Sequence, residues 1–144
     1  MPHETLLKFN YPDTLLHEYH HWAVLLRPKQ VTVGSLVLVC TADVTSMAEV
    51  SAEAFAELST VTADLEGVLK NAFAYDKINY LLLMMVDKHV HFHIIPRYAD
   101  PRTACGIEFT DTAWPKPPDV TQGVDITEPQ FADLFQLLRS QWPR

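Results

Sequence analysis

The spacing of apolar and polar positions divides the chain into several extended segments and two helical ones. Continuous apolar or β-branched runs predict buried strands over 22–27, 33–40 and 78–86, and alternation with a period of two predicts another over 89–95. Spacings of three and four instead predict a helix that buries one face. We expect such a helix from Ser51, its cap, to about Asn71. Its apolar stripe consists of Phe55, Leu58, Thr62, Leu65, Leu69 and Ala72.

The connections between these segments predict how they are arranged. Only Asp87-Lys88 separates two strands, so those strands are expected to be antiparallel neighbours. The proline-rich segment 99–122 is expected to be irregular. A capping box at Thr127-Glu128-Pro129-Gln130 then predicts a final helix over about 127–142. The order of elements predicts a single α+β domain over 1–144 with an antiparallel sheet.

Three histidines alternate with apolar residues in the sequence His-Val-His-Phe-His-Ile-Ile-Pro-Arg, residues 89–97. On a strand, His89, His91 and His93 would share one face, with the imidazoles about 6–7 Å apart. Because imidazole titrates near neutral pH, such a row indicates proton transfer, nucleophilic attack or metal binding.

Three interpretations of this row are open: a solvent-facing row without function, a metal site, and an imidazole that attacks an electrophile such as phosphorus. Catalytic zinc takes about three ligands that converge on one point, whereas side chains along one strand diverge. No Cys, Asp or Glu in this segment completes a ligand set on the histidine face. Nucleophilic catalysis is therefore the leading hypothesis, and we expect no metal.

Charge and cysteine content limit the partners and the compartment. The net charge of −7 argues against a broad basic surface for nucleic acid, but it allows a small nucleotide site. Cys40 and Cys105 form no C-x-x-C motif, so we expect reduced thiols in a cytoplasmic protein. We expect no signal peptide, and the apolar runs are too short to span a bilayer.

The histidine row, followed by Pro96-Arg97, resembles the signature of the histidine triad (HIT) superfamily: His, apolar, His, apolar, His, apolar, apolar. The order of elements upstream is similar as well: a strand at 22–27, a strand at 34–39 that begins with Gly-Ser, then the long helix. The resemblance covers about 20–98. It implies a HIT-like antiparallel sheet of about five strands, one long helix and a C-terminal helix.

The resemblance also implies an activity. HIT proteins hydrolyse or transfer nucleotidyl groups at the α-phosphate of purine nucleotide esters, amides and dinucleoside polyphosphates such as diadenosine polyphosphates. His91 would be the nucleophile and carry a transient nucleotidyl group. The backbone carbonyl of His89 would fix the tautomer of His91, and His93 would donate to phosphate oxygens or to the leaving group. The resemblance implies no cofactor and a homodimer whose two sheets join.

The sequence departs from the family pattern at two places. Ser35 follows Gly34, where HIT proteins usually carry a fourth histidine. Its hydroxyl is a further candidate for substrate binding, because it can donate one hydrogen bond, but it cannot carry a proton as an imidazolium does. The short segment 85–88 replaces a glycine-rich loop and a Gln-Ser/Thr pair, so contacts to the leaving group would come from elsewhere. These departures leave a second hypothesis open, a catalytically weak nucleotide-binding or interaction module.

Four further residues are candidates for substrate binding. Arg97 could bind phosphate or pair with an acid at the surface. Leu25 and Leu26 could line the floor of a nucleoside pocket or belong to the core. Asn79 could hydrogen-bond a ribose or a neighbouring turn. The sequence alone does not determine whether 99–122 covers the site.

Overall fold

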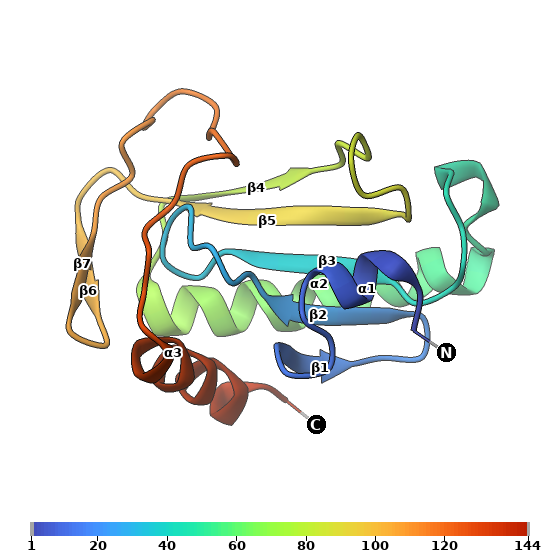
Figure 1. Cartoon of the computed structure of the whole chain (residues 1–144), viewed down its shortest axis with the longest axis horizontal. Helices are drawn as coiled ribbons and strands as arrows, with labels where there is room; N and C mark the ends of the chain where they lie inside the picture. Colours follow the sequence, from blue (N-terminus) through green and yellow to red (C-terminus); the bar gives the residue numbers. More distant parts are fainter. Residues whose placement is uncertain (1, 144) are drawn as a thin grey trace.

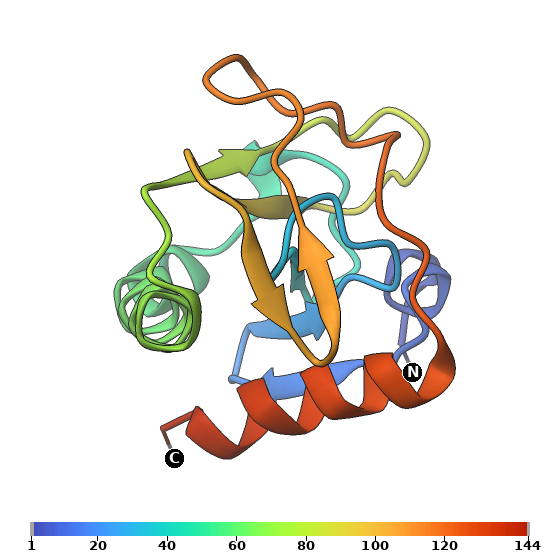
Figure 2. The ribbon, with the colours of Figure 1, turned by 90° about the vertical axis from the view of Figure 1, so that its left-hand side faces the viewer.

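The computed structural model describes residues 2–143 and consists of one antiparallel sheet between helices (Figure 1). The long helix α2 covers one face of the sheet, and the short helix α1 covers part of the other (Figure 2). The elements in chain order are α1 (Glu4–Lys8), β1 (Leu15–Glu18), β2 (Trp22–Leu26), β3 (Leu36–Cys40), η1 (Met47–Glu49), α2 (Ala52–Phe73), β4 (Lys77–Leu81), β5 (His91–Arg97), β6 (Arg102–Ala104), β7 (Ile107–Phe109) and α3 (Glu128–Gln141).

The sheet has five strands in the order β1-β2-β3-β5-β4, and all neighbouring pairs are antiparallel. The predicted α+β class, with an antiparallel sheet of about five strands, one long helix and a C-terminal helix, is therefore confirmed. Strands β1 and β4 form the two edges. Strands β6 and β7 form a separate hairpin.

Two clusters of buried apolar side chains pack against the two faces of the sheet. The larger lies between the sheet and α2 and includes Trp22, Leu38 and Leu65, all at most 1% exposed. The smaller joins Leu6 and Phe9, which α1 carries, to Ala23, Leu25, Val37 and Val39 on the opposite face. Ser51 caps α2 by accepting a hydrogen bond from the Ala54 N–H, as the sequence predicts. Thr127 and Gln130 form the predicted capping box of α3.

Strands β4 and β5 are antiparallel neighbours, as predicted, but the expected two-residue connection at Asp87-Lys88 is wrong. Strand β4 ends at Leu81, and residues 82–90 form a loop before β5 begins at His91. The apolar run continues past β4, but its side chains are exposed, up to 87% at Met85. Since no neighbouring element buries these side chains, the run extends no strand. Lys8 pairs with Asp87 at 3.2 Å and ties the loop to α1.

Elements α1 and β1 were not predicted, and 99–122 is more ordered than expected because it contains the β6–β7 hairpin. Residues 110–124, which we call the strap, run from this hairpin back across the sheet toward α3 (Figure 1). Arg27 donates to the Val120 carbonyl, and Gln30 forms a β-bridge with Val124, so the strap is fixed to the turn after β2. Among residues 2–143, no helix is long and apolar enough to cross a bilayer.

Candidate active site

His91 and His93 lie on β5 opposite Val39 and Val37 of β3, so both imidazoles face the side of the sheet that α1 covers. Both are buried, with 2% and 7% exposure. Their ring centroids are 5.1 Å apart, and the Phe9 ring lies 5.9 Å from each. The two histidines thus form a compact pair held between the sheet and the end of α1.

The hydrogen bonding of His91 determines its tautomer. Its Nδ1 lies 2.7 Å from the backbone carbonyl of His89. Because a carbonyl oxygen only accepts, Nδ1 carries the hydrogen and Nε2 of the neutral ring keeps a lone pair. No hydrogen-bond partner for this Nε2 occurs within residues 2–143. His91 therefore presents an unoccupied nucleophilic nitrogen.

His93 is a buried imidazole with an unsatisfied nitrogen. Its Nδ1 is shielded from solvent and has no partner in the described part of the chain. Burial, assisted by the charges of Arg27 and His91, lowers the pKa of His93 from 6.5 to about 4, while Asp87 acts in the opposite direction. His93 is therefore neutral near pH 7 and offers one N–H for a hydrogen bond. A bound phosphate would raise the pKa, since a nearby anion favours the charged imidazole.

His89 lies in the loop before β5, so its side chain does not join a ladder of three on the strand. Its Nε2 lies 2.6 Å from Asp43 Oδ1, and its Nδ1 lies 3.0 Å from Thr5 Oγ1. The His3 ring stacks on the His89 ring with a centroid distance of 3.8 Å. Sequence reasoning missed His3, Thr5 and Asp43, because no periodic pattern links them to residue 89.

Arg97 is buried at the other end of β5 in a network of protein partners. Its Nε and Nη2 donate to both carboxylate oxygens of Asp111, at 2.7 and 3.1 Å. Nη1 donates to Asn79 Oδ1, and Nη2 also donates to the Lys116 carbonyl. Of the two alternatives, the structure therefore shows the acid pair, although it is buried instead of exposed at the surface. Asn79 therefore accepts a hydrogen bond from Arg97. Neither of the two roles predicted for Asn79, binding a ribose or bonding a neighbouring turn, includes this contact.

The remaining candidates separate by the face on which they lie. The Ser35 hydroxyl is buried; it donates to the Thr32 carbonyl and accepts from the Thr32 N–H. Both hydrogen bonds therefore stabilise the turn that contains Ser35. Leu25 lies on the histidine face but packs under Leu6 and Phe9. Leu26 belongs to the core on the α2 side. A nucleoside pocket on the histidine face therefore cannot include Leu26, and that expectation is corrected.

Arg27 is a further polar residue that sequence reasoning missed. Its Nη1 donates to the Lys29 carbonyl and its Nη2 to the Val120 carbonyl, while its buried Nε has no partner within residues 2–143. After burial, its positive charge is the largest cause of the lowered pKa of His93. The alternation of β2, which places Ala23 and Leu25 on the histidine face, also assigns residue 27 to that face.

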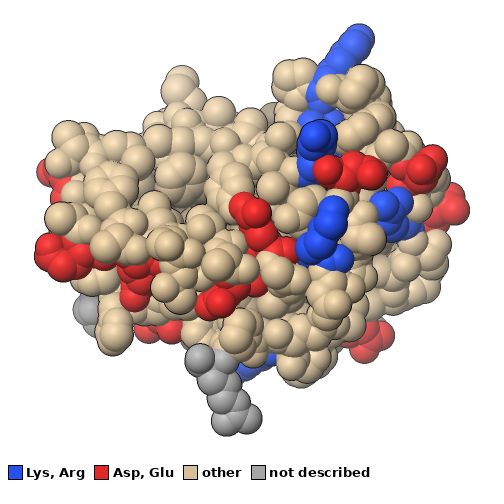
Figure 3. All heavy atoms as spheres, turned by 180° about the vertical axis from the view of Figure 1, so that it is seen from behind, with Lys and Arg blue, Asp and Glu red and all other residues tan. Residues whose placement is uncertain are grey.

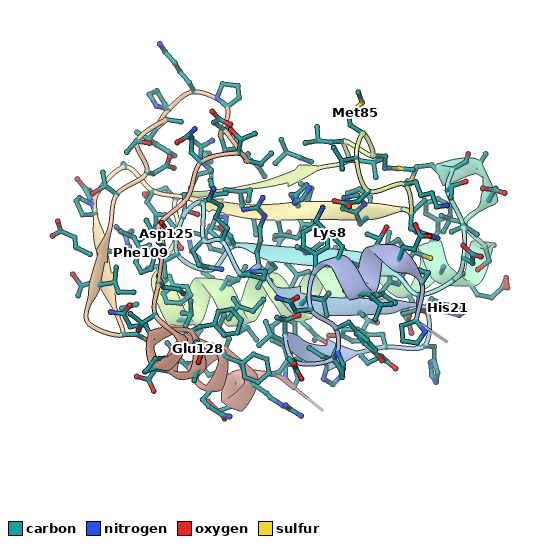
Figure 4. The ribbon with its side chains drawn as sticks, in the orientation of Figure 1. Lys8, His21, Met85, Phe109, Asp125 and Glu128 are labelled. Atoms are coloured by element: carbon teal, nitrogen blue, oxygen red, sulfur yellow. The ribbon has the colours of Figure 1, made fainter. Side chains whose placement is uncertain are left out.

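A hollow of about 510 Å³ opens beside the end of α1, and its lining residues include some that are close to Phe9 in the sequence. It is lined by Leu7, Asn10, Tyr11, Asp13, Thr14, Pro28, Ile126, Thr127, Glu128 and Phe131. Figure 4 labels Glu128, one of these lining residues, at the start of α3. No group of three His, Cys, Asp or Glu side chains suited to a metal occurs in the described range 2–143.

On the face behind the sheet, basic side chains gather at one side among acidic ones (Figure 3).

Comparisons with known proteins agree with this geometry. The family model described as "HIT domain" matches residues 8–100. A histidine triad protein from Bradyrhizobium japonicum shares 22% identity over 99% of this chain and 97% of its own, with a TM-score of 0.76. A histidine triad protein from Marinobacter aquaeolei shares 25% identity over 99% and 95%, also with a TM-score of 0.76. A histidine triad (HIT) protein from Sinorhizobium meliloti shares 20% identity over 98% and 96%, with a TM-score of 0.75.

The comparison with curated proteins found no match. The HIT match covers well over half of the chain and includes all of β5, which carries His91 and His93. The chain belongs to the HIT domain family.

Proposed function

We propose that this protein hydrolyses or transfers a nucleotidyl group at an α-phosphate, through a nucleotidyl intermediate on His91. One observation carries the proposal: the 2.7 Å bond between His91 Nδ1 and the His89 carbonyl leaves the Nε2 lone pair available for attack. HIT family membership supports nucleotide chemistry in general, and the substrate and the intermediate are our proposals.

The reaction proceeds in two displacements at phosphorus. Nε2 of His91 attacks the α-phosphorus, a P–Nε2 bond forms, and the bond from phosphorus to the leaving group breaks with its electron pair. The imidazole becomes cationic, and its Nδ1–H bond to the His89 carbonyl stabilises that charge. Water then attacks phosphorus, the P–Nε2 bond breaks, and the electron pair returns to Nε2. The products are the nucleoside monophosphate and a proton.

His93 assists the first displacement from its position 5.1 Å from the His91 ring. Neutral in the free protein, it donates one N–H to a phosphate oxygen or to the leaving group. The negative charge of the phosphate raises its proton affinity during binding. The ring therefore takes up a proton from solvent when the phosphate binds and supplies it to the departing oxygen or nitrogen; the proton released from the attacking water in the second displacement replaces it.

We propose purine nucleotides as substrates, with diadenosine polyphosphates and AMP amides as the first compounds to examine. A two-fold homodimer and a cytoplasmic location belong to the same proposal. The dimer is supported by the edge strand β4, which is followed by the exposed apolar residues Leu82, Leu83, Met85 and Val86. Figure 4 shows Met85 directed away from the fold beyond β4. The location is supported by Cys40 and Cys105, which are both free.

A substrate panel with His91→Ala tests the proposal. We expect AMP release from diadenosine polyphosphates or AMP amides by the unaltered protein, and a loss of about 10³-fold or more in His91→Ala. The matched control is His20→Ala, which removes an imidazole that is 94% exposed. Rapid acid quenching followed by mass spectrometry should detect the nucleotidyl adduct, and His91→Ala should lack it.

Full activity in His91→Ala would contradict the role of this residue. Tight AMP binding without turnover of any substrate on the panel would instead identify a nucleotide-binding module. Turnover that is abolished by chelators and restored by a divalent metal would contradict the mechanism without a metal.

A further inference from the structure

The N-terminal segment that carries His3 and Thr5 lies directly against His89, although the HIT match begins only at residue 8. These two side chains therefore lie outside the residues that the family model matches. Their contacts converge on His89, whose carbonyl binds Nδ1 of the proposed nucleophile His91.

Thr5 contacts His89 twice, and the hydrogen bonds form a consistent set. The Asp43 carboxylate accepts from His89 Nε2–H at 2.6 Å, which leaves Nδ1 as the acceptor of the neutral ring. The Thr5 hydroxyl, 3.0 Å away, therefore donates to Nδ1. The same oxygen accepts from the backbone N–H of His89 at 3.3 Å. One hydroxyl thus fixes both the ring and the backbone of the residue that orients His91.

His3 covers the other side of this arrangement. Its ring lies parallel to the His89 ring, within 5°, at a centroid distance of 3.8 Å. Its Nε2 lies 2.7 Å from the Cys40 carbonyl, so Nε2 carries the hydrogen, and Nδ1 accepts from the Leu6 N–H at the start of α1. His3 therefore holds the His89 ring in place and connects it to α1 and to the end of β3.

The opposite end of α1 reaches the reactive pair itself. Phe9 lies against His91 and His93, and Lys8 pairs with Asp87 in the loop before β5. The short helix therefore contacts His89 at its beginning and both strand histidines at its end. It is fixed to the site at two points.

We infer that His3 and Thr5 are positioning residues for His91, acting through the peptide of His89. They hold the His89 carbonyl where it keeps the hydrogen on Nδ1 of His91 and the lone pair on Nε2. This inference rests on the proposed role of His91 as nucleophile. A positioning defect slows the chemical step and leaves substrate affinity nearly unchanged, whereas a loose helix without this role only lowers stability.

The test uses the full chain with Thr5→Val, which keeps the shape of the side chain and removes the hydroxyl, and Thr5→Ser, which restores it. We expect kcat to fall about 10- to 100-fold in Thr5→Val, with KM within about threefold, and to recover in Thr5→Ser. Glu4→Gln, on the same helix at a side chain that is 82% exposed, is the matched control and should keep the unaltered kcat.

Imidazole ¹⁵N NMR provides a readout that needs no substrate. In the unaltered protein and in Thr5→Ser, His91 should be protonated on Nδ1, and Thr5→Val should show a mixture of tautomers. If Thr5→Val does not fold, His3→Leu makes the same comparison, with His3→Phe restoring the stacked ring. Unchanged kcat and tautomer in the folded variants would overturn the inference. An unaltered protein that shows the Nδ1–H tautomer but turns over no substrate would overturn the proposed function instead, and the NMR comparison would still decide the positioning role.

Discussion

Polar side chains are buried at both ends of β5, but the two ends differ in whether the buried polar atoms have hydrogen-bond partners. At one end, Nε, Nη1 and Nη2 of Arg97 all have partners, supplied by Asp111, Asn79 and the Lys116 carbonyl. Towards the other end, His93 Nδ1 is buried without a partner in the range 2–143. A buried polar group without a hydrogen bond costs free energy, so folds usually satisfy such groups. The satisfied end stabilises the fold, whereas the unsatisfied end has hydrogen-bonding capacity left for a ligand.

Replacing Arg97 by Met should have the largest effect on stability. It leaves the Asp111 carboxylate, 3% exposed, buried without its cation, and should lower the free energy of unfolding by about 3–5 kcal/mol. Urea denaturation measures this loss, and AMP binding per folded molecule should be unchanged. If Arg97→Met instead weakens AMP binding and leaves stability unchanged, both ends of β5 contribute to ligand binding. The contrast drawn between the two ends would then be wrong.

The unsatisfied end should make stability depend on pH. The pKa of His93 is about 4 in the folded protein and 6.5 as the reference value, so between these values the unfolded chain binds a proton that the folded one does not. Stability therefore falls as pH falls from about 6.5 to 4, by up to about 3 kcal/mol in all.

His93→Gln should remove this component, which urea denaturation at pH 7 and pH 4.5 can measure. His3, whose pKa is also lowered mainly by burial, contributes in the same direction in both proteins, so the difference between them isolates His93. If the free energy of unfolding depends on pH identically in the unaltered protein and in His93→Gln, burial of His93 does not lower stability at acidic pH.

Ser35→Ala should have the smallest effect and sharpens the boundary of the site. Loss of the hydroxyl that bonds Thr32 should cost about 1 kcal/mol of stability. Turnover should stay within about twofold, because this hydroxyl contacts its own turn and neither histidine. A large fall in kcat without a change in stability would place Ser35 in the site after all.

Features determined by nearby residues could be predicted from the sequence. The strands around 22–27 and 33–40 follow from apolar runs, and α2 and α3 follow from a stripe and from their caps at Ser51 and Thr127. The alternation at His91 and His93 correctly placed both on one face of a strand. Each of these signals lies within or next to the element that it predicts.

Features determined by distant contacts could not be predicted. An apolar run does not show where a strand ends, and the loop 82–90 depends on Asp87 meeting Lys8 and on His89 meeting Asp43. Helix α1 has five residues, too few for a periodic pattern, and Thr5 lies 84 residues from its partner. The bonds that fix the ring and backbone of His89 therefore appear only in the folded chain.

The two edges of the sheet differ in their capacity to accept another strand. Strand β1 has four residues and an irregular register between Leu15 and His17, and α3 packs beside it (Figure 2). Short, irregular and covered edges resist strand addition. Strand β4 has five residues in regular register with β5, and no strand within residues 2–143 pairs with its outer side. Two copies paired at β4 by two-fold symmetry would leave only the covered β1 edges, so the proposed homodimer would offer no open edge for further growth.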